Sequence, residues 1–187
     1  MDQVLLGKLL IATPGLEDTR FYKTVILICE HSDQATMGLI LNKPLFNFKT
    51  NKLLKQMKIE ANSSLNIDDT FYGGPVHLNQ GFIIHSDEKK YSSSECILEK
   101  TIITTSEDIL IDISNGKAPI NTKVFLGCAV WDKNQLNNEI IQNSWIITDS
   151  KKDLIFYNNN KKLSLWDKSL IDIGVDPLKL ITYSGNA

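Results

Sequence analysis

The hydrophobic pattern is clearest where two short apolar runs each end in a pair of polar residues. The runs are Val25–Cys29, followed by Glu30 and His31, and Met37–Leu41, followed by Asn42 and Lys43. Short apolar runs bounded by turn residues are typical of buried strands. The four polar side chains therefore follow core strands directly. We predict that they form a ligand- or partner-binding site at the strand ends.

Further apolar runs predict several strands with helices between them. Strands are expected at Leu9–Ala12, Gly81–His85, Cys96–Leu98, Thr101–Thr104 and Val124–Val130. Apolar residues at helical spacing predict helices at Asn47–Lys58 (with Thr50 as N-cap), Glu107–Asn115, Gln135–Gln142 and Leu163–Ile173, with Gly174 ending the last and Pro177 preventing its continuation. We read Pro75–Gln80 as a turn.

Strands in clusters, without regular strand–helix alternation, favour the α+β class. We predict one domain over residues 1–187. Its sheet is expected to be mixed, largely antiparallel and curled toward a barrel, with several short helices packed on it. A hydrophobic content of 42% is enough for a substantial core.

The charge balance gives no support to a nucleic-acid partner. The chain has 20 Lys and Arg and 22 Asp and Glu, so its formal charge is -2. Arg20 is its only arginine. Guanidinium groups are the usual bidentate readers of phosphate and guanine. Neither a helix-turn-helix pair nor a concentrated basic helix is visible.

The cysteine and hydropathy patterns indicate a cytoplasmic protein away from membranes. Cys29, Cys96 and Cys128 are widely spaced and form no C-x-x-C pair, which favours buried, reduced thiols. No segment reaches the roughly 18 to 20 apolar residues that span a bilayer.

Four features could carry chemistry, and each also has a purely structural interpretation. Glu30 and His31 could act as an acid/base pair or simply end a strand. Cys128, after Gly127, could be a nucleophile beside His31 or His85, or a small buried thiol. The turn Gly73-Gly74-Pro75 could bind an anion, but a turn that needs a positive φ is favoured.

Trp131 could lie on a recognition surface or pack in the core. The sequence has no phosphate-loop or dinucleotide motif and no ligand spacing typical of a metal site. We therefore assign no catalytic residue, no metal and no cofactor. The candidate binding residues are Glu30, His31, Asn42, Lys43, Gly73, Gly74, Pro75 and Trp131.

The order of short motifs along nearly the whole chain resembles the YqgE/AlgH family of small bacterial proteins. The motifs are Leu10–Pro14, Phe21–His31, Met37–Pro44, Gly73–Val76, Gly81–His85, Thr104–Asp108, Gly127–Trp131, Gln135–Ile140, Asn143–Trp145 and Ile173–Asp176. The resemblance implies an α+β domain with a partly barrel-like mixed sheet in the bacterial cytosol. The family's function is largely unassigned, and one branch carries a transcriptional-regulator label. No catalytic residue can be transferred.

Three functions stay open on the sequence. The first is a non-enzymatic binding or regulatory domain for a small ligand or a protein, and the second is a transcriptional regulator that acts directly or indirectly on DNA. The third is a hydrolase or transferase that uses Cys128 with His31 or His85. A homodimer formed through an exposed strand edge is compatible with each of them.

Overall fold

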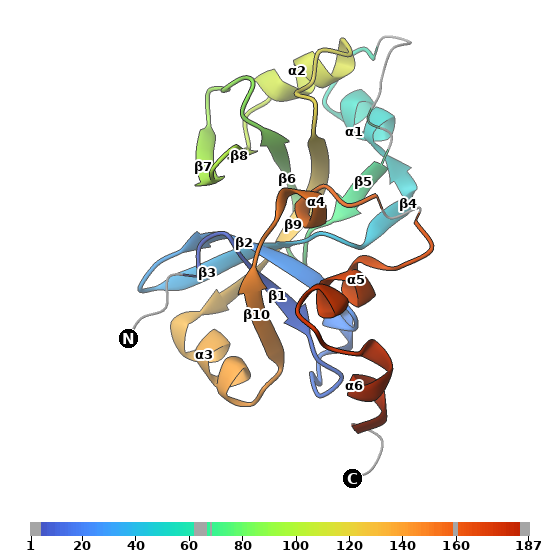
Figure 1. Ribbon diagram of the computed structural model, residues 1–187. Coiled ribbons are helices and arrows are strands. Elements are labelled where there is room, and N and C mark those ends of the chain that lie inside the picture. Colours follow the sequence, from blue (N-terminus) through green and yellow to red (C-terminus); the bar gives the residue numbers. More distant parts are fainter. Residues whose placement is uncertain (1–4, 62–66, 68, 159–160, 184–187) are drawn as a thin grey trace. The chain divides into compact units, whose positions relative to one another are not determined.

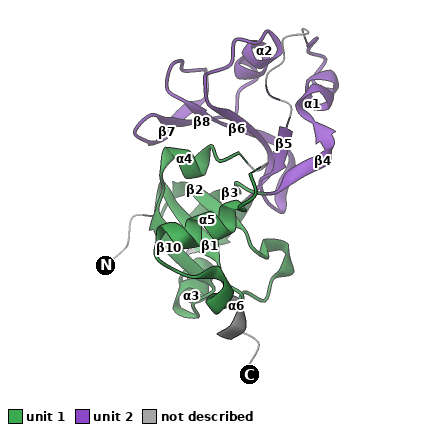
Figure 2. Cartoon of the chain, turned by 45° about the vertical axis from the view of Figure 1, so that its right-hand side comes forward, with its two compact units in different colours: residues 1–42, 129–187 green, residues 43–128 purple. Residues whose placement is uncertain are grey.

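The chain folds as an α+β protein with one largely antiparallel set of strands (Figure 1). The computed structural model describes residues 5–61, 67, 69–158 and 161–183. Contacts divide the chain into two compact units, namely unit 1 (residues 1–42 and 129–187) and unit 2 (residues 43–128) (Figure 2). Strand β9 (Thr122–Asp132) contributes to both. The predicted class is confirmed, while a single domain over the whole chain stays a prediction.

Unit 1 contains an antiparallel sheet in the order β10-β1-β2-β3-β9. Its strands are β1 (Lys8–Ala12), β2 (Val25–His31), β3 (Ala35–Ile40), residues 129–132 of β9, and β10 (Trp145–Asp149). Its helices are η1 (Thr19–Phe21), α3 (Lys133–Ile141), α4 (Lys152–Ile155), α5 (Leu165–Asp172) and α6 (Pro177–Tyr183). The central strands β1 and β2 are apolar at nearly every position because both of their faces are buried.

Unit 2 contains strands in the order β4-β5-β9-β6-β8-β7, and the β5–β9 pair is parallel. The strands are β4 (Pro44–Lys49), β5 (Asp69–Tyr72), β6 (Val76–Ser86), β7 (Ser94–Leu98), β8 (Thr101–Thr104) and residues 122–128 of β9. Helices α1 (Thr50–Gln56) and α2 (Asp108–Ser114) bury leucine and isoleucine side chains against Ile83 and Val124 of the sheet. This packing forms the apolar core of unit 2.

Local structure differs from the sequence predictions in three places. The helix expected from Asn47 begins at Thr50, because Pro44–Lys49 forms β4 against β5. Thr50 is thus the first helical residue rather than the N-cap, and its hydroxyl lies 3.2 Å from Thr70 Oγ1. Residues 76–80, expected in a turn, are the first half of β6.

A further helix begins at Pro177, a few residues after the end of α5. Gly174 adopts a φ of 78° after α5, as a helix terminator does. Pro177 then occupies the first position of α6, where its missing N–H has no helical partner to lose. The sequence analysis recognised the end of α5 but not the new helix.

Candidate functional site

Three side chains form a row across the end of the unit 1 sheet. Thr36 of β3 lies opposite His31 of β2 on one side and Trp131 of β9 on the other. Cross-strand partners project from the same face of a sheet. His31 Nδ1 lies 2.8 Å from the buried Thr36 Oγ1. The structure therefore brings two of the predicted site residues, His31 and Trp131, into one row through a residue that the sequence analysis did not select.

Glu139 of α3 connects this row to β10. One carboxylate oxygen, Oε2, accepts the indole N–H of Trp131 at 3.0 Å and that of Trp145 at 2.7 Å. The other oxygen accepts from the Gln135 side-chain amide at 2.9 Å. Both indole rings are almost fully buried. Glu139 thus satisfies two donors that would otherwise lack a partner in the core.

An aromatic cluster surrounds these hydrogen bonds. Phe21, Trp131 and Trp145 lie with ring centroids 5.7 to 6.0 Å apart, and both contacts of Trp145 are edge-to-face. Helix α3 begins where it does because the Asp132 side chain accepts the Gln135 amide N–H at 2.7 Å, as an N-cap does. Trp131 is consequently a core residue that positions the site, and its ring is only 2% exposed.

The exposed part of this end is the β2–β3 turn. Glu30 is exposed, and His31 is half-buried with its Nδ1 held by Thr36. Within the described ranges, His31 Nε2 has no hydrogen-bond partner. The Ser32 side chain accepts the main-chain N–H groups of Gln34 and Ala35, which fixes the turn. An oriented imidazole with one open nitrogen is therefore presented at this end, while Glu30, the preceding residue of β2, projects from the opposite face of the sheet.

The second predicted pair, Asn42 and Lys43, does not join this end. Strands β2 and β3 are antiparallel, so the residues after β3 lie at the opposite end of the hairpin from His31. Asn42 accepts the main-chain N–H of Val25 at 3.0 Å and donates to the carbonyl of Lys23 at 2.8 Å. This amide fixes local backbone, and Lys43 already belongs to unit 2. The expectation of one site built from both strand ends is therefore wrong.

The Gly73-Gly74-Pro75 segment lies between β5 and β6 in unit 2 and makes a close backbone approach to β9. Gly73 donates its N–H to the carbonyl of Leu126 at 2.8 Å. A Cβ atom on Gly127, whose φ is +73°, would lie 2.5 Å from the carbonyl oxygen of Gly74. The segment thus has a structural role, because its backbone lies close to the backbone of β9 and only glycine leaves enough space there.

Cys128 lies in a setting that suppresses nucleophilic chemistry. Its side chain is fully buried, and burial raises the pKa of the thiol to about 11. Val76 is the cross-strand partner of Cys128, whereas Thr122 is the partner of His85. Six residues of β9 separate those two positions, which corresponds to roughly 20 Å at the rise of a strand. Cys128 and His85 therefore do not form a thiol–imidazole pair.

His85 is the centre of a separate polar cluster in unit 2. The ring is fully buried, with Nδ1 2.8 Å from the Ser86 carbonyl oxygen and Nε2 2.9 Å from Thr104 Oγ1. The Thr104 hydroxyl also contacts Ser94 Oγ at 2.8 Å. Burial is the main effect on the pKa of His85 and lowers it, which favours the neutral ring. Nδ1 faces a carbonyl and therefore carries the proton.

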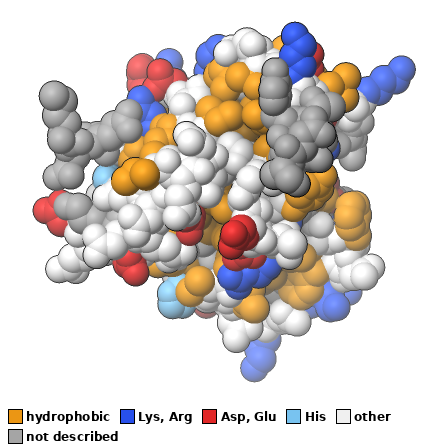
Figure 3. Space-filling view, turned by 90° about the horizontal axis from the view of Figure 1, so that it is seen from below, with side chains coloured by type: hydrophobic (Ala, Val, Ile, Leu, Met, Phe, Trp, Pro, Cys, Tyr) orange, Lys and Arg blue, Asp and Glu red, His pale blue; other side chains and the backbone are white. Residues whose placement is uncertain are grey.

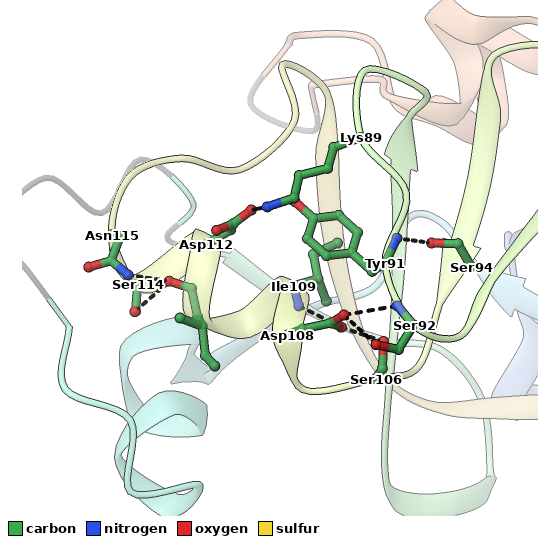
Figure 4. A network of polar contacts seen from close by, with 11 residues as sticks. Lys89, Tyr91, Ser92, Ser94, Ser106, Asp108, Ile109, Asp112, Ser114 and Asn115 are labelled. Carbon is green, nitrogen blue, oxygen red and sulfur yellow. Dashed lines mark hydrogen bonds and ion pairs between the residues drawn. The ribbon is translucent and has the colours of Figure 1, made fainter.

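Neighbouring residues extend this cluster to the surface of α2 (Figure 4). Tyr91 packs its ring edge-on to His85 and donates its hydroxyl to Asp112, which also pairs with Lys89. Asp108 accepts both the main-chain N–H and the hydroxyl of Ser92 at 2.8 Å. Hydrogen bonds, the largest from Ser106, lower the pKa of Asp108 to about 2. These contacts tie the 86–94 loop to α2.

The remaining predicted features concern charge, thiols and membranes. On the face shown in Figure 3, Lys and Arg lie in separate groups among acidic and apolar side chains. No cluster of three or more potential metal ligands occurs among the described residues. Cys29 is buried as expected, but Cys96 is exposed on β7. None of the helices in the described ranges has the length and apolar character needed to cross a bilayer.

Sequence reasoning missed Thr36 and Glu139. A lone Thr in a strand gives no signal, because its importance comes from having His31 and Trp131 as partners on either side. Glu139 lies on a short, mostly polar helix and looks like a solvent-facing residue. The one usable signal was the local run from Trp131 to Trp145, in which Glu139 is the only carboxylate within the predicted helix Gln135–Gln142.

The fold and this site together define a small α+β protein in which one strand serves two sheets. The chain belongs to the AlgH-like family, whose model matches residues 9–178. It is 36% identical over 182 residues to a UPF0301 protein of Pectobacterium atrosepticum, covering 95% of this chain and 96% of the relative. A UPF0301 protein of Buchnera aphidicola is 39% identical over 182 residues, with 95% of each chain covered.

Solved structures show the same fold. The solution structure of the AlgH protein from Pseudomonas aeruginosa matches with a TM-score of 0.77 at 30% identity, over 97% of both chains. A crystal structure of a Corynebacterium diphtheriae protein matches with a TM-score of 0.71 at 19% identity, over 98% of this chain and 93% of that one. The likeness to AlgH confirms the curled, mainly antiparallel sheet that the sequence predicted.

Proposed function

We propose that the protein is a non-enzymatic binding domain, and that the end of unit 1 around His31 holds a small ligand or a protein partner. The observation that carries this proposal is the orientation of His31. Thr36 fixes Nδ1, so Nε2 is available as a directed hydrogen-bonding group at a half-exposed position. The exposed carboxylate of Glu30 lies on the other face of β2 and is not part of this arrangement.

Rigid support beneath His31 favours recognition. Thr36 and Trp131 are both buried, and Trp131 is held by Glu139. A side chain that is ordered before binding loses less conformational entropy when its partner arrives. The row His31–Thr36–Trp131 therefore resembles a supported recognition element more than a mobile surface histidine.

The state of the candidate nucleophile speaks against the enzymatic alternative. A thiol with a pKa of about 11 is almost entirely protonated at neutral pH, and His85 lies too far along β9 to act as a base for Cys128. Slow labelling of Cys128 by iodoacetamide at pH 7, in folded protein whose exposed Cys96 reacts readily, is the expected result. Rapid labelling of Cys128 would favour the hydrolase or transferase.

A thermal-shift screen against metabolites, nucleotides and divalent ions tests the binding proposal. A ligand present at one hundred times its dissociation constant adds about 2.7 kcal/mol to the free energy of unfolding. We expect His31→Gln to abolish the shift and Thr36→Val, which removes the anchor of the ring, to weaken it. His77→Gln is the matched control, because His77 is an exposed histidine of unit 2.

The outcomes separate the candidate functions. A shift that His31→Gln and His77→Gln leave equally intact would place the ligand elsewhere and refute the His31 site. If no compound in the screen shifts the protein, a pull-down with wild-type and His31→Gln protein as bait tests the protein-partner form of the proposal. Salt-dependent binding of mixed genomic fragments in a gel shift would instead support a regulator that acts on DNA.

A further inference from the structure

The three edge strands of the described sheets differ in how well they are protected. β7 and β4 each have a register shift against their single neighbour, β8 and β5 respectively. Bulges and register breaks are common ways of blunting an edge against another strand. β10 instead pairs with β1 over five consecutive residues without a shift. It is the one regular, unblunted edge among these three.

The sequence of β10 also lacks the usual protection of an edge. Its residues Trp-Ile-Ile-Thr-Asp have high strand propensity and include no Pro, Gly or Lys. Ile146, Ile147 and Thr148 are half-buried, and Asp149 is exposed. The carboxylate of Asp149 is already paired with Lys8 of the neighbouring strand. β10 therefore presents a short, regular and nearly neutral edge.

The hydrogen-bond pattern shows which groups β10 presents. Thr13 donates its N–H to the carbonyl of Ser144, so the alternate residues Ile146 and Thr148 point their main-chain groups toward β1. The N–H and C=O groups of Trp145, Ile147 and Asp149 point away from it. These outward main-chain groups have no hydrogen-bond partner in the described part of the chain.

We propose that β10 pairs with β10 of a second copy of this chain, antiparallel about a two-fold axis at Ile147. In this register, Ile147 faces Ile147 of the second copy, and Trp145 faces its Asp149. All three outward N–H groups and all three outward C=O groups of each copy are then satisfied. Ile146 lies opposite Thr148, so apolar and β-branched side chains meet on both faces.

A second copy fits this edge better than an arbitrary peptide for two reasons. The three outward-facing residues are self-complementary in this register, so one strand supplies every donor and acceptor that the other needs. No like charges stand opposite each other in this register, because Asp149 faces Trp145 and keeps Lys8 as its partner within its own chain. This inference is independent of the proposed function at His31.

Molecular mass in solution tests the proposal first. Sedimentation of the full chain over a concentration series from about 1 to 500 μM should show the mass rising from one copy toward two. A mass that stays at one copy over the whole series would overturn the proposal. Failure here leaves the ligand shift of His31 unaffected, so the two proposals fail separately.

Disulfide cross-linking then tests the register, in a background with Cys96→Ser. Ile147→Cys places two thiols on the axis, with Cα atoms about 5.5 Å apart, inside the range for a disulfide. Asp149→Cys is the matched control, because its two copies would lie roughly 14 Å apart along the strands. We expect mild oxidation to give a covalent dimer of Ile147→Cys only. Dimerisation without that difference between the variants would show that another surface mediates it.

Discussion

Glu139 in unit 1 and His85 in unit 2 are both at the centre of hydrogen-bonded clusters, but their partners behave differently. Glu139 accepts from two indole N–H groups, which can only donate. His85 contacts a carbonyl and a hydroxyl, and that hydroxyl continues to Ser94. Because Nδ1 of His85 carries the proton, Nε2 accepts from Thr104, and each hydroxyl of the unit 2 cluster therefore donates to a single acceptor. In the unit 1 cluster, one carboxylate oxygen serves two donors.

This comparison indicates where each unit tolerates change. Removing the single acceptor in unit 1 leaves two buried donors unsatisfied. Removing the Thr104 hydroxyl in unit 2 leaves one buried acceptor, Nε2 of His85, without its donor. All three tryptophans of the chain lie in unit 1, so indole fluorescence reports on unit 1 alone. The comparison can therefore be tested with a probe specific to one unit and circular dichroism for the whole chain.

Replacing Glu139 should give the largest effect. Each unsatisfied buried donor costs about 1–3 kcal/mol, so we expect Glu139→Ala to lower the free energy of unfolding by about 3 kcal/mol. Urea unfolding followed by indole fluorescence measures this loss. Glu139→Gln keeps one oxygen that can accept both indoles and should lose only about 1 kcal/mol. Equal losses in the two variants would mean that the indole hydrogen bonds contribute little.

A smaller loss is expected for Thr104→Val in unit 2. Valine keeps the shape and removes the hydroxyl that joins His85 to Ser94. Ser94 Oγ still accepts the main-chain N–H of Tyr91 at 2.7 Å. We expect a loss of about 1 kcal/mol in urea unfolding followed by far-ultraviolet circular dichroism. A loss as large as that of Glu139→Ala would mean that one buried acceptor costs as much as two buried donors.

The smallest effect is a dependence of stability on pH through His85. Burial lowers the pKa of His85 below the ordinary histidine value of about 6.5, although the Ser86 carbonyl and the nearby carboxylate of Glu88 act in the opposite direction. The unfolded chain therefore takes up a proton as the pH falls below 6.5, while the folded chain does not until its lower pKa is reached. The free energy of unfolding should decrease from pH 6.5 downward, by at most about 1.4 kcal/mol per pH unit.

His85→Gln tests this assignment through the change in the free energy of unfolding with pH, whatever its value at any single pH. Unfolding midpoints in urea, measured between pH 7.5 and 5, should vary less with pH in the variant than in the wild type. His77→Gln removes an exposed histidine of the same unit and should leave the slope unchanged. A slope that survives in His85→Gln would assign the pH dependence to another group.

The sequence predicted those parts of the fold that depend on local pattern. Apolar runs located β1, β2, β3 and β9, and capping residues located α2 and α5 to within two residues at each end. β4 was missed because this short strand, Pro44–Lys49, adjoins a stronger helical pattern with Leu53 and Leu54. The strand character of β4 depends on its pairing with β5, and the local sequence pattern does not show that pairing.

The candidate site was predicted only in part, and the reason is strand direction. Glu30 with His31 and Asn42 with Lys43 are equivalent in the sequence, since each pair ends an apolar run. Antiparallel pairing places them at opposite ends of one hairpin. Direction and register are set by tertiary contacts, which a local pattern does not contain. Glu139 was missed for the same reason, because its role depends on tertiary contacts with two indoles from different strands.

Unit 1 is interrupted in the sequence, and this affects the order in which the protein can fold during synthesis. Strand β3 leaves the ribosome early. The segment that pairs with it, residues 129–132 of β9, is synthesised only after all of unit 2. Translation adds 5–20 residues per second, so the free edge of β3 stays without its partner strand for roughly 5–20 s. Unit 2 is contiguous and complete by then. Translation therefore orders the two folding events, with the inserted unit first and the interrupted one last.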